Sequence, residues 1–337
     1  MTLHTTFPVR SRYHSAMILG ISAKRPPKVA VVVVTYNNLA DTRLCLGSLR
    51  ASAYPNADVI VVDNGSAERE DTPLGQEFGE FASAIRVAPN RGYASGANAG
   101  IRLALQGEAR YVWLLNNDTI IRGDALSTLV RTLESDQGLG LVSPLILGSE
   151  HEDWSAEVWF AGGEVRLSRA SAGHRLNLDL SEPTLPTDYV SGCAMLVRRE
   201  LFEAIGLLDE TMFLFWEDVD FSLRARQSGW RLAVVPTARV HHRVHGTIGR
   251  GSRDYLMARN GRIVAGRYAT PRELVLLTAA TVAKAARALP FAIRARDERR
   301  ELLRGYSDGT RLMAIGALTR ARRHIGIPVA GARPSTR

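Results

Sequence analysis

The segment VAVVVVT at residues 29–35 is an unbroken run of β-branched and small apolar residues. A strand with one face in water alternates apolar and polar residues, whereas a strand buried on both faces is apolar throughout. Strands buried in this way belong to parallel sheets that helices cover on both sides. The run therefore predicts an α/β protein and argues against a β-sandwich.

Helical and strand patterns alternate along the first half of the chain, which predicts right-handed βαβ units and an open sheet. The expected elements after the first strand are helix 41–53, strand 58–66, helix 73–82, strand 84–90, helix 95–106, strand 111–118, helix 124–135 and strand 138–144. Ligands bind beyond the carboxyl ends of such strands. Residues 150–197 are richer in glycine and in short alternating runs, which predicts antiparallel strands added to the same sheet.

Both ends of the chain differ from this central part. Residues 1–27 predict an irregular leader, and their longest apolar run, residues 16–21, is shorter than the apolar region of a signal peptide. Beyond residue 252 the pattern predicts successive helices at 254–269, 271–289, 291–306 and 309–326. The apolar stretch within 271–289 falls short of the roughly 20 residues that span a bilayer. We expect a leader over 1–27, an α/β domain over 28–252 and a helical extension over 253–337.

The net charge of +9 is concentrated in the extension. Residues 1–239 carry a net charge of −5, whereas residues 240–337 carry +14. A basic tail can bind nucleic acid, anionic lipid or phosphorylated substrates. Helices that pack on their own domain and turn arginines to water give the same pattern, so packing and membrane contact both stay open. No RNA-binding or helix-turn-helix signature accompanies the tail, which argues against nucleic acid.

The cysteines and the segment after the first strand argue against three further classes of protein. Cys45 and Cys193 are far apart and lack metal-ligand spacing, which excludes a disulfide scaffold and a structural zinc cluster and fits a reducing cytoplasm. The segment TYNNLAD at 35–41 contains no glycine. A dinucleotide-binding enzyme requires a glycine-rich turn there, so that class is excluded as well.

Three clusters carry groups suited to chemistry. Asp63 and the triplet Asn116-Asn117-Asp118 follow predicted strands, where a carboxylate can accept a pyrimidine imide N–H or bind a divalent cation. Asp63 also fits a simple turn. The other two clusters are the histidines His241, His242 and His245, and the acidic residues Glu217, Asp218 and Asp220. Acidic residues also favour the first turn of a helix, so each cluster has a purely structural interpretation when taken by itself.

The order of the motifs is more specific than any one of them. TYN, VVDNGS, RGYASGANAG, LLNNDT, SGCAMLVRR, WEDVD and HH follow one another between residues 35 and 242. This order resembles the inverting glycosyltransferases of family 2, which have the GT-A fold, and most closely their rhamnosyltransferase-like branch. The resemblance covers residues 28–260. It implies a mixed central sheet flanked by helices, followed here by the C-terminal helical extension, and inverting transfer of a sugar from a nucleotide diphosphate donor.

The resemblance assigns the donor site by position. Tyr36 would stack on or flank the base, and Asp63 would accept the imide N–H of uracil or thymine. Arg91 and Asn98 would line the diphosphate side. Ser191 and Gly192 would approach the donor sugar.

It also assigns the metal and the catalytic base. Asn117 and Asp118 stand where the family has its Asp-x-Asp element, and Asp118 would bind Mg²⁺ or Mn²⁺ together with His242, with His241 as the alternative. Because one carboxylate is missing from Asn-Asn-Asp, we expect weak metal affinity in the absence of the nucleotide. Asp218 would take the proton from the acceptor hydroxyl, ahead of the neighbouring Glu217 and Asp220.

These assignments imply a metal-dependent enzyme of cell-wall or surface-polysaccharide assembly. Its partners would be a dTDP- or UDP-sugar, such as dTDP-rhamnose, and a saccharide or lipid-linked saccharide acceptor. We expect a cytoplasmic protein that the basic helices attach to the inner face of the cell membrane, or that forms homo-oligomers through them. A nucleotide-sugar-binding scaffold without turnover and a nucleic-acid-binding protein are the alternative functions.

Overall fold

The computed structural model describes residues 25–52, 54–148, 157–176, 179–243, 248–294 and 298–324. Most of the predicted leader and His245 lie outside these ranges. Residues 25–28 have no regular secondary structure and lead into the first strand.

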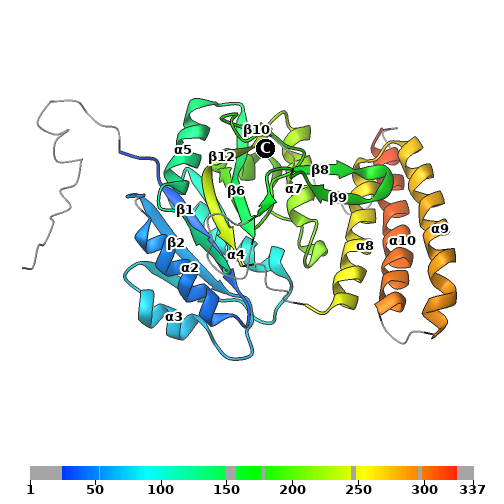
Figure 1. The fold of residues 1–337 in the computed structure, drawn as a ribbon, viewed down its shortest axis with the longest axis horizontal. Coiled ribbons are helices and arrows are strands. Elements are labelled where there is room, and N and C mark those ends of the chain that lie inside the picture. Colours follow the sequence, from blue (N-terminus) through cyan, green and yellow to red (C-terminus); the bar gives the residue numbers. More distant parts are fainter. Residues whose placement is uncertain are drawn as a thin grey trace, which may run out of the picture.

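A mixed sheet forms the centre of the molecule (Figure 1). Its strands lie in the order β10 (Leu185–Pro186), β12 (Arg231–His242), β6 (Leu139–Gly148), β11 (Ala194–Arg198), β4 (Tyr111–Asn116), β1 (Val29–Thr35), β2 (Ala57–Asp63) and β3 (Ala82–Arg86), with β5 (Thr119–Ile121) on β12 and β7 (Val158–Phe160) on β6. Strands β1 to β4 are parallel, and β11 is antiparallel to both β4 and β6. The predicted addition of antiparallel strands is thus confirmed. A hairpin, β8 (Gly163–Arg166) and β9 (Ser171–His174), stands apart from the sheet.

Helices cover both faces of the sheet, as the apolar run of β1 predicted. Val29, Val31 and Val33 of β1 pack under α2 (Leu39–Ala51), α3 (Asp71–Phe78) and α5 (Ala125–Ser135). The alternate residues of β1 pack under α4 (Tyr93–Gln106), α6 (Arg199–Ile205) and α7 (Glu217–Gln227). Short 3-10 turns occur at Leu167–Arg169 and Glu210–Met212. The strand is therefore enclosed on both sides by apolar side chains.

The C-terminal extension forms a layer of helices beside this domain: α8 (Arg250–Tyr268), α10 (Glu298–His324) and α9 (Pro271–Arg294), which lies farthest from the sheet in Figure 1. The prediction of separate helices at 291–306 and 309–326 was wrong, because α10 runs unbroken through Gly305 and Gly309. These glycines allow α10 to pack closely on α8. An added Cβ would lie 2.6 Å from the carbonyl oxygen of Tyr255 at Gly305, and 2.9 Å from Cα of Arg259 at Gly309.

Two other helical glycines allow a direct test of how closely the helices pack on the sheet. A Cβ at Gly100 of α4 would clash with Cγ1 of Val32 and come within 3.2 Å of Cγ2 of Val62, so Gly100→Ala overpacks the interface between helix and sheet. We expect it to lower the free energy of unfolding by about 1–3 kcal/mol. Gly47→Ala in α2 is the matched control, since its Cβ would meet nothing within 4 Å. It should raise stability by about 0.5–1 kcal/mol.

The measurement is the midpoint of urea unfolding at constant slope. Equal midpoints for Gly100→Ala and the natural protein would contradict the close packing of α4 on β1.

Candidate active site

The register of the central strands brings their polar ends to one edge of the sheet. Thr35 at the end of β1 pairs with Asp63 at the end of β2, and Val34 pairs with the last residue of β4. Asn117 and Asp118 follow β4 directly and so lie at this edge too. Open α/β sheets bind their ligands at this edge.

Asp63 is fully buried, and neighbouring groups hold its carboxylate in place. Oδ1 accepts the backbone N–H of Ser66 at 2.9 Å, while Oδ2 accepts the backbone N–H of Glu70 at 3.1 Å and the guanidinium of Arg86. Burial acts to raise the pKa of Asp63, but these donors outweigh it and lower the pKa below its usual value. Arg86 is absent from the predicted site. It ends β3 directly opposite Asp63, so an alignment of strand ends could have found it.

Tyr36 and Asn117 follow the ends of β1 and β4 and differ in their surroundings. Tyr36 follows β1 and is 37% exposed, so its ring is accessible at the sheet edge. The Asn117 side chain points inward, and its Nδ2 group donates to Oγ1 of Thr42 at 2.9 Å and to Oγ1 of Thr35 at 3.3 Å. Asn117 therefore braces the junction between β1 and α2.

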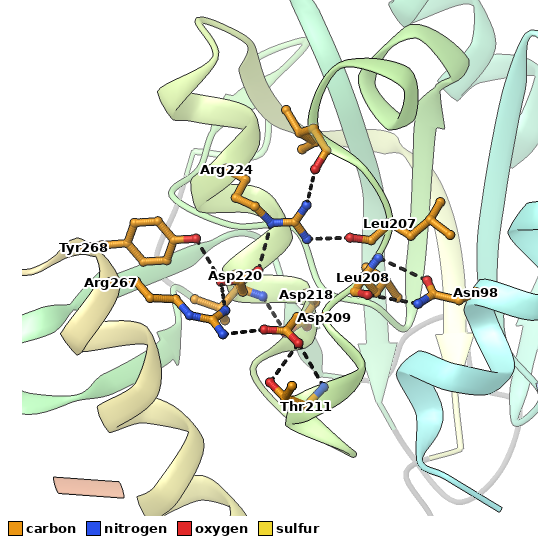
Figure 2. Close-up of polar contacts among 12 residues, drawn as sticks. Asn98, Leu207, Leu208, Asp209, Thr211, Asp218, Asp220, Arg224, Arg267 and Tyr268 are labelled. Atoms are coloured by element: carbon orange, nitrogen blue, oxygen red, sulfur yellow. Dashed lines mark hydrogen bonds and ion pairs between the residues drawn. The ribbon is translucent and has the colours of Figure 1, made fainter. Parts of the chain in front are cut away.

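The two residues expected on the diphosphate side have separate surroundings. Arg91 is exposed on the approach to α4. Asn98 is buried within α4, and its Nδ2 group donates to the carbonyl of Leu208 and to Oε1 of Glu210, both at 2.9 Å. Its Oδ1 accepts the N–H of Leu208 at 3.0 Å (Figure 2). Asn98 thus ties α4 to the loop before the 3-10 turn at Glu210–Met212, which departs from the expected phosphate-side role.

Strand pairing brings Asp118 and His242 together. Asp118 lies in the turn between β4 and β5, and β5 pairs Thr119 with His242 of β12. The imidazole Nε2 of His242 lies 3.2 Å from Oδ1 of Asp118. Burial acts to lower the pKa of His242, but Cys193 and Asp118 beside it outweigh burial and raise the pKa well above its usual value. His241 precedes His242 in the extended strand and so points to the opposite face of the sheet.

The three acidic residues at the start of α7 have three different environments. Asp218 accepts the backbone N–H of Gly192 at 2.9 Å and that of Val219 at 2.8 Å, while burial raises its pKa. Glu217 is buried, and burial together with the charge of Asp218 raises its pKa to about 8. Asp220 binds the side chains of Arg224, Arg267 and Tyr268. These contacts give Asp220 a structural role and favour Asp218 as the predicted base.

The segment before β11 links Asp218 to the end of β4. The carbonyl of Cys193 accepts the N–H of Asn116 at 2.9 Å, so Gly192 lies next to the Asn117-Asp118 turn. An added methyl at Gly192 would lie 3.4 Å from Cβ of Asp218, which shows how closely this carboxylate approaches the backbone. Ser191 beside it is buried and accepts the N–H of Cys193 at 3.3 Å.

Trp159, which the sequence prediction missed, packs on His242 and is itself in contact with His174. The ring of Trp159 in β7 contacts the ring of His242 edge-on, with centroids 4.7 Å apart, and that of His174 at 4.5 Å. His174 Nδ1 lies 2.7 Å from the carbonyl oxygen of Trp159. A single tryptophan in a short alternating run carried no signal for this role.

The donor atoms at the edge suit a divalent cation. Asp118 and His242 offer one carboxylate oxygen and one imidazole nitrogen, both of which are ligands for Mn²⁺. No set of three or more His, Cys, Asp or Glu side chains converges as metal ligands within the described part of the chain. A cation held by two side chains needs further ligands, which phosphate oxygens can supply.

Sequence comparisons show which family the chain is similar to. A sequence model of the family described as "Glycosyltransferase like family 2" matches residues 26–250. The N-acetylglucosaminyl-diphospho-decaprenol L-rhamnosyltransferase of Mycobacterium tuberculosis is 27% identical over 264 residues, which cover 68% of this chain and 80% of that protein. The low-salt glycan biosynthesis hexosyltransferase Agl10 of Haloferax volcanii is 28% identical over 203 residues, or 59% of this chain and 62% of that protein. The dTDP-rhamnosyl transferase RfbF of Shigella flexneri is 20% identical over 219 residues, covering 64% and 69%.

Solved structures establish the fold. The crystal structure of GalNAc-T7 with UDP, GalNAc and Mn²⁺ superposes with a TM-score of 0.61 at 15% identity, covering 90% of this chain and 59% of that one. The mannosyltransferase PcManGT of Pyrobaculum calidifontis, in complex with GDP-Man and Mn²⁺, gives 0.53 at 18% identity, covering 91% and 92%. The mixed sheet and its flanking helices are those of the GT-A fold, as predicted. Because the family match spans more than half of its residues, the chain belongs to glycosyltransferase family 2.

Proposed function

We propose that the protein transfers a hexose, with inversion, from a dTDP- or UDP-sugar to an acceptor hydroxyl in the assembly of a cell-wall or surface polysaccharide. The observation that carries the proposal is the meeting of three groups at one edge of the sheet: the buried carboxylate of Asp63, the Asp118–His242 pair, and Asp218 bonded to Gly192. Two relatives are named as rhamnosyltransferases, which supports rhamnose as the sugar. A lipid-linked saccharide as acceptor fits the name of the mycobacterial relative.

Asp63 and Tyr36 are the proposed base-binding residues. The bonds from Ser66, Glu70 and Arg86 fix the orientation of the Asp63 carboxylate, and its lowered pKa keeps it ionised as an acceptor for a pyrimidine imide N–H. The exposed ring of Tyr36 can flank the same base. Arg91, exposed before α4, is available to the diphosphate.

Asp218 is the proposed general base. Its carboxylate would accept the proton of the acceptor hydroxyl as the hydroxyl oxygen attacks the anomeric carbon, and the bond from that carbon to the diphosphate oxygen would break on the opposite side. Burial raises the pKa of Asp218 and thereby its basicity. Ser191 and Gly192 would lie beside the donor sugar. The N–H of Gly192 would hold the Asp218 carboxylate in place.

Asp118 and His242 are the proposed ligands of Mg²⁺ or Mn²⁺. A bound cation neutralises phosphate charge as the nucleoside diphosphate leaves. In the structure the two side chains contact each other, which keeps both at the sheet edge before a ligand arrives.

The base assignment predicts that Asp218→Asn abolishes transfer, because the amide cannot accept the acceptor proton. We expect turnover to fall by about 10²–10⁴-fold while donor affinity stays nearly unchanged. Transfer from a labelled donor gives the rate, and calorimetry gives the affinity. Turnover above about a tenth of the natural rate would contradict the assignment and direct attention to Glu217. Loss of both binding and turnover would point to a structural role instead.

The metal assignment predicts that Asp118→Ala weakens binding of the nucleoside diphosphate chiefly when metal is present. In this scheme Asp118 would act on the phosphates only through a bound cation, so its removal should matter little when metal is absent. Calorimetry with and without Mn²⁺ measures the difference. An equal loss of affinity under both conditions would contradict metal binding by Asp118.

We also propose that the outer helices, α9 and α10, attach the enzyme to an anionic membrane. None of the described helices is long and apolar enough to span a membrane. However, α9, which lies farthest from the sheet in Figure 1, exposes Val275, Leu276 and Val282, with exposed fractions of 69%, 51% and 64%. Exposed Arg272 and Arg287 lie on the same helix. An apolar face with flanking arginines is typical of a helix that lies in the surface of an anionic bilayer.

Co-sedimentation with phosphatidylglycerol vesicles tests this attachment. We expect binding at low salt that falls at high salt, because each basic residue near the surface contributes about 1 kcal/mol and is screened by ions. Leu276→Ser should weaken binding. Leu44→Ser, on α2 in the catalytic domain, is the matched control, since Leu44 is 50% exposed and Leu276 is 51% exposed. Absence of pelleting at low salt would contradict attachment and favour a capping or homo-oligomer role for these helices.

A further inference from the structure

The turn that leads into α7 has an unusual backbone. Phe213, Phe215 and Trp216 have φ angles of 62°, 67° and 75°. Bulky residues rarely adopt positive φ, so such a turn persists only where other contacts hold it. Asp218 follows Trp216 by two residues, and the position of its carboxylate therefore depends on this turn.

Asn260 of α8 supplies such contacts. Its side chain is fully buried, and its Nδ2 group contacts the carbonyl oxygens of Met212 at 2.7 Å, Leu214 at 3.0 Å and Phe215 at 2.9 Å. Because the amide has two N–H groups, two of these oxygens share one hydrogen. The guanidinium of Arg259 donates to Asn260 Oδ1 at 3.0 Å, which fixes the side of the amide that faces the turn. One amide thus holds the main chain of the turn at three points.

Packing holds the turn from two sides. A Cβ added at Gly261 of α8 would lie 2.7 Å from Cζ2 of Trp216, so the indole rests directly on the helix backbone. On the other side, the N–H of Tyr93 at the start of α4 donates to the carbonyl of Phe213 at 2.6 Å. The turn is therefore held between α4 and α8.

Ion pairs from α8 hold the flanks of the same segment, as Figure 2 shows. Arg267 binds Asp209 at 2.5 Å and Asp220 at 2.8 Å, and Tyr268 donates to Asp220 at 2.8 Å. Asp209 precedes the turn and Asp220 follows it. Helix α8 thus contacts the segment 209–220 before, within and after the turn.

We propose that Asn260 is a positioning residue for catalysis, which holds the 213–216 turn so that the Asp218 carboxylate faces the acceptor hydroxyl. The inference rests on the proposed role of Asp218 as base. Asn260 bonds main-chain carbonyls of the turn, which leads into Asp218 and itself includes none of the proposed donor-binding residues. Its loss should therefore lower the rate of transfer without weakening donor binding.

The test compares Asn260→Leu, which removes the amide donors at similar volume, with the natural full-length chain. We expect kcat per folded molecule to fall about 10²-fold, the scale of a misplacement of reacting groups by about 1 Å. The Kd for the donor nucleotide, measured by calorimetry, should change by less than about twofold. Gly261→Ala leaves Asn260 unchanged, but its Cβ would lie 2.7 Å from Cζ2 of Trp216 and 2.8 Å from the carbonyl oxygen of Ala170, so it displaces Trp216 from the same helix. It should show the same division between kcat and Kd. If Asn260→Leu fails to fold, the Gly261→Ala variant tests the positioning role by itself.

Arg262→Met is the matched control. Arg262 is also buried in α8, but it donates to the carbonyl of Ala258 and to Oγ1 of Thr281, both at 2.8 Å, within the helical layer. We expect this variant to lose stability and to keep kcat per folded molecule within about twofold. Unchanged kcat in both Asn260→Leu and Gly261→Ala, or an equal loss in Arg262→Met, would overturn the positioning role. Full activity of Asp218→Asn in the same assay would overturn the base assignment instead.

Discussion

The enclosure of β1 on both faces is the constraint from which the rest of the structure follows. Because apolar side chains cover both sides of the strand, water cannot reach its N–H and C=O groups, and β2 and β4 have to pair them along its whole length. Parallel neighbours require crossover helices, and these helices supply the cover. Polar side chains are then confined to the strand ends. The site lies where the enclosure stops.

Much of this arrangement could be predicted because its signals are local. The apolar run of β1, the alternation of elements and the polar residues at strand ends are each readable within a few residues of sequence. The break predicted between residues 306 and 309 failed for an instructive reason. Gly305 and Gly309 read locally as a helix end, but they are sites of close contact with α8, and tertiary packing outweighs helix propensity there. Asn98 and Arg86 likewise depend on partners distant in sequence, at Leu208 and Asp63.

The acidic cluster shows what the sequence could not rank. Glu217, Asp218 and Asp220 occupy one helical turn and have similar local contexts, so sequence reasoning favoured Asp218 through family resemblance. Their surroundings separate them. Asp220 is ion-paired with Arg224 and Arg267, and Asp218 accepts main-chain N–H groups beside the end of β4. Burial and the charge of Asp218 raise the pKa of Glu217 to about 8. Adjacent carboxylates of one helical turn thus have different environments because they have different partners.

The contacts of α8 with the 209–220 segment change where the chain can be divided. The sequence places a boundary near residue 252, where the sheet domain ends, yet α8 completes the main-chain hydrogen bonding of that domain. The extension can therefore be divided no earlier than the end of α8. Chimeras that exchange the outer helices between members of the family, in order to redirect an enzyme to another surface, should retain α8 with its own sheet. In modular terms, the first helix of the extension belongs to the catalytic unit, and an exchanged α10 has to keep the glycine face that packs on α8.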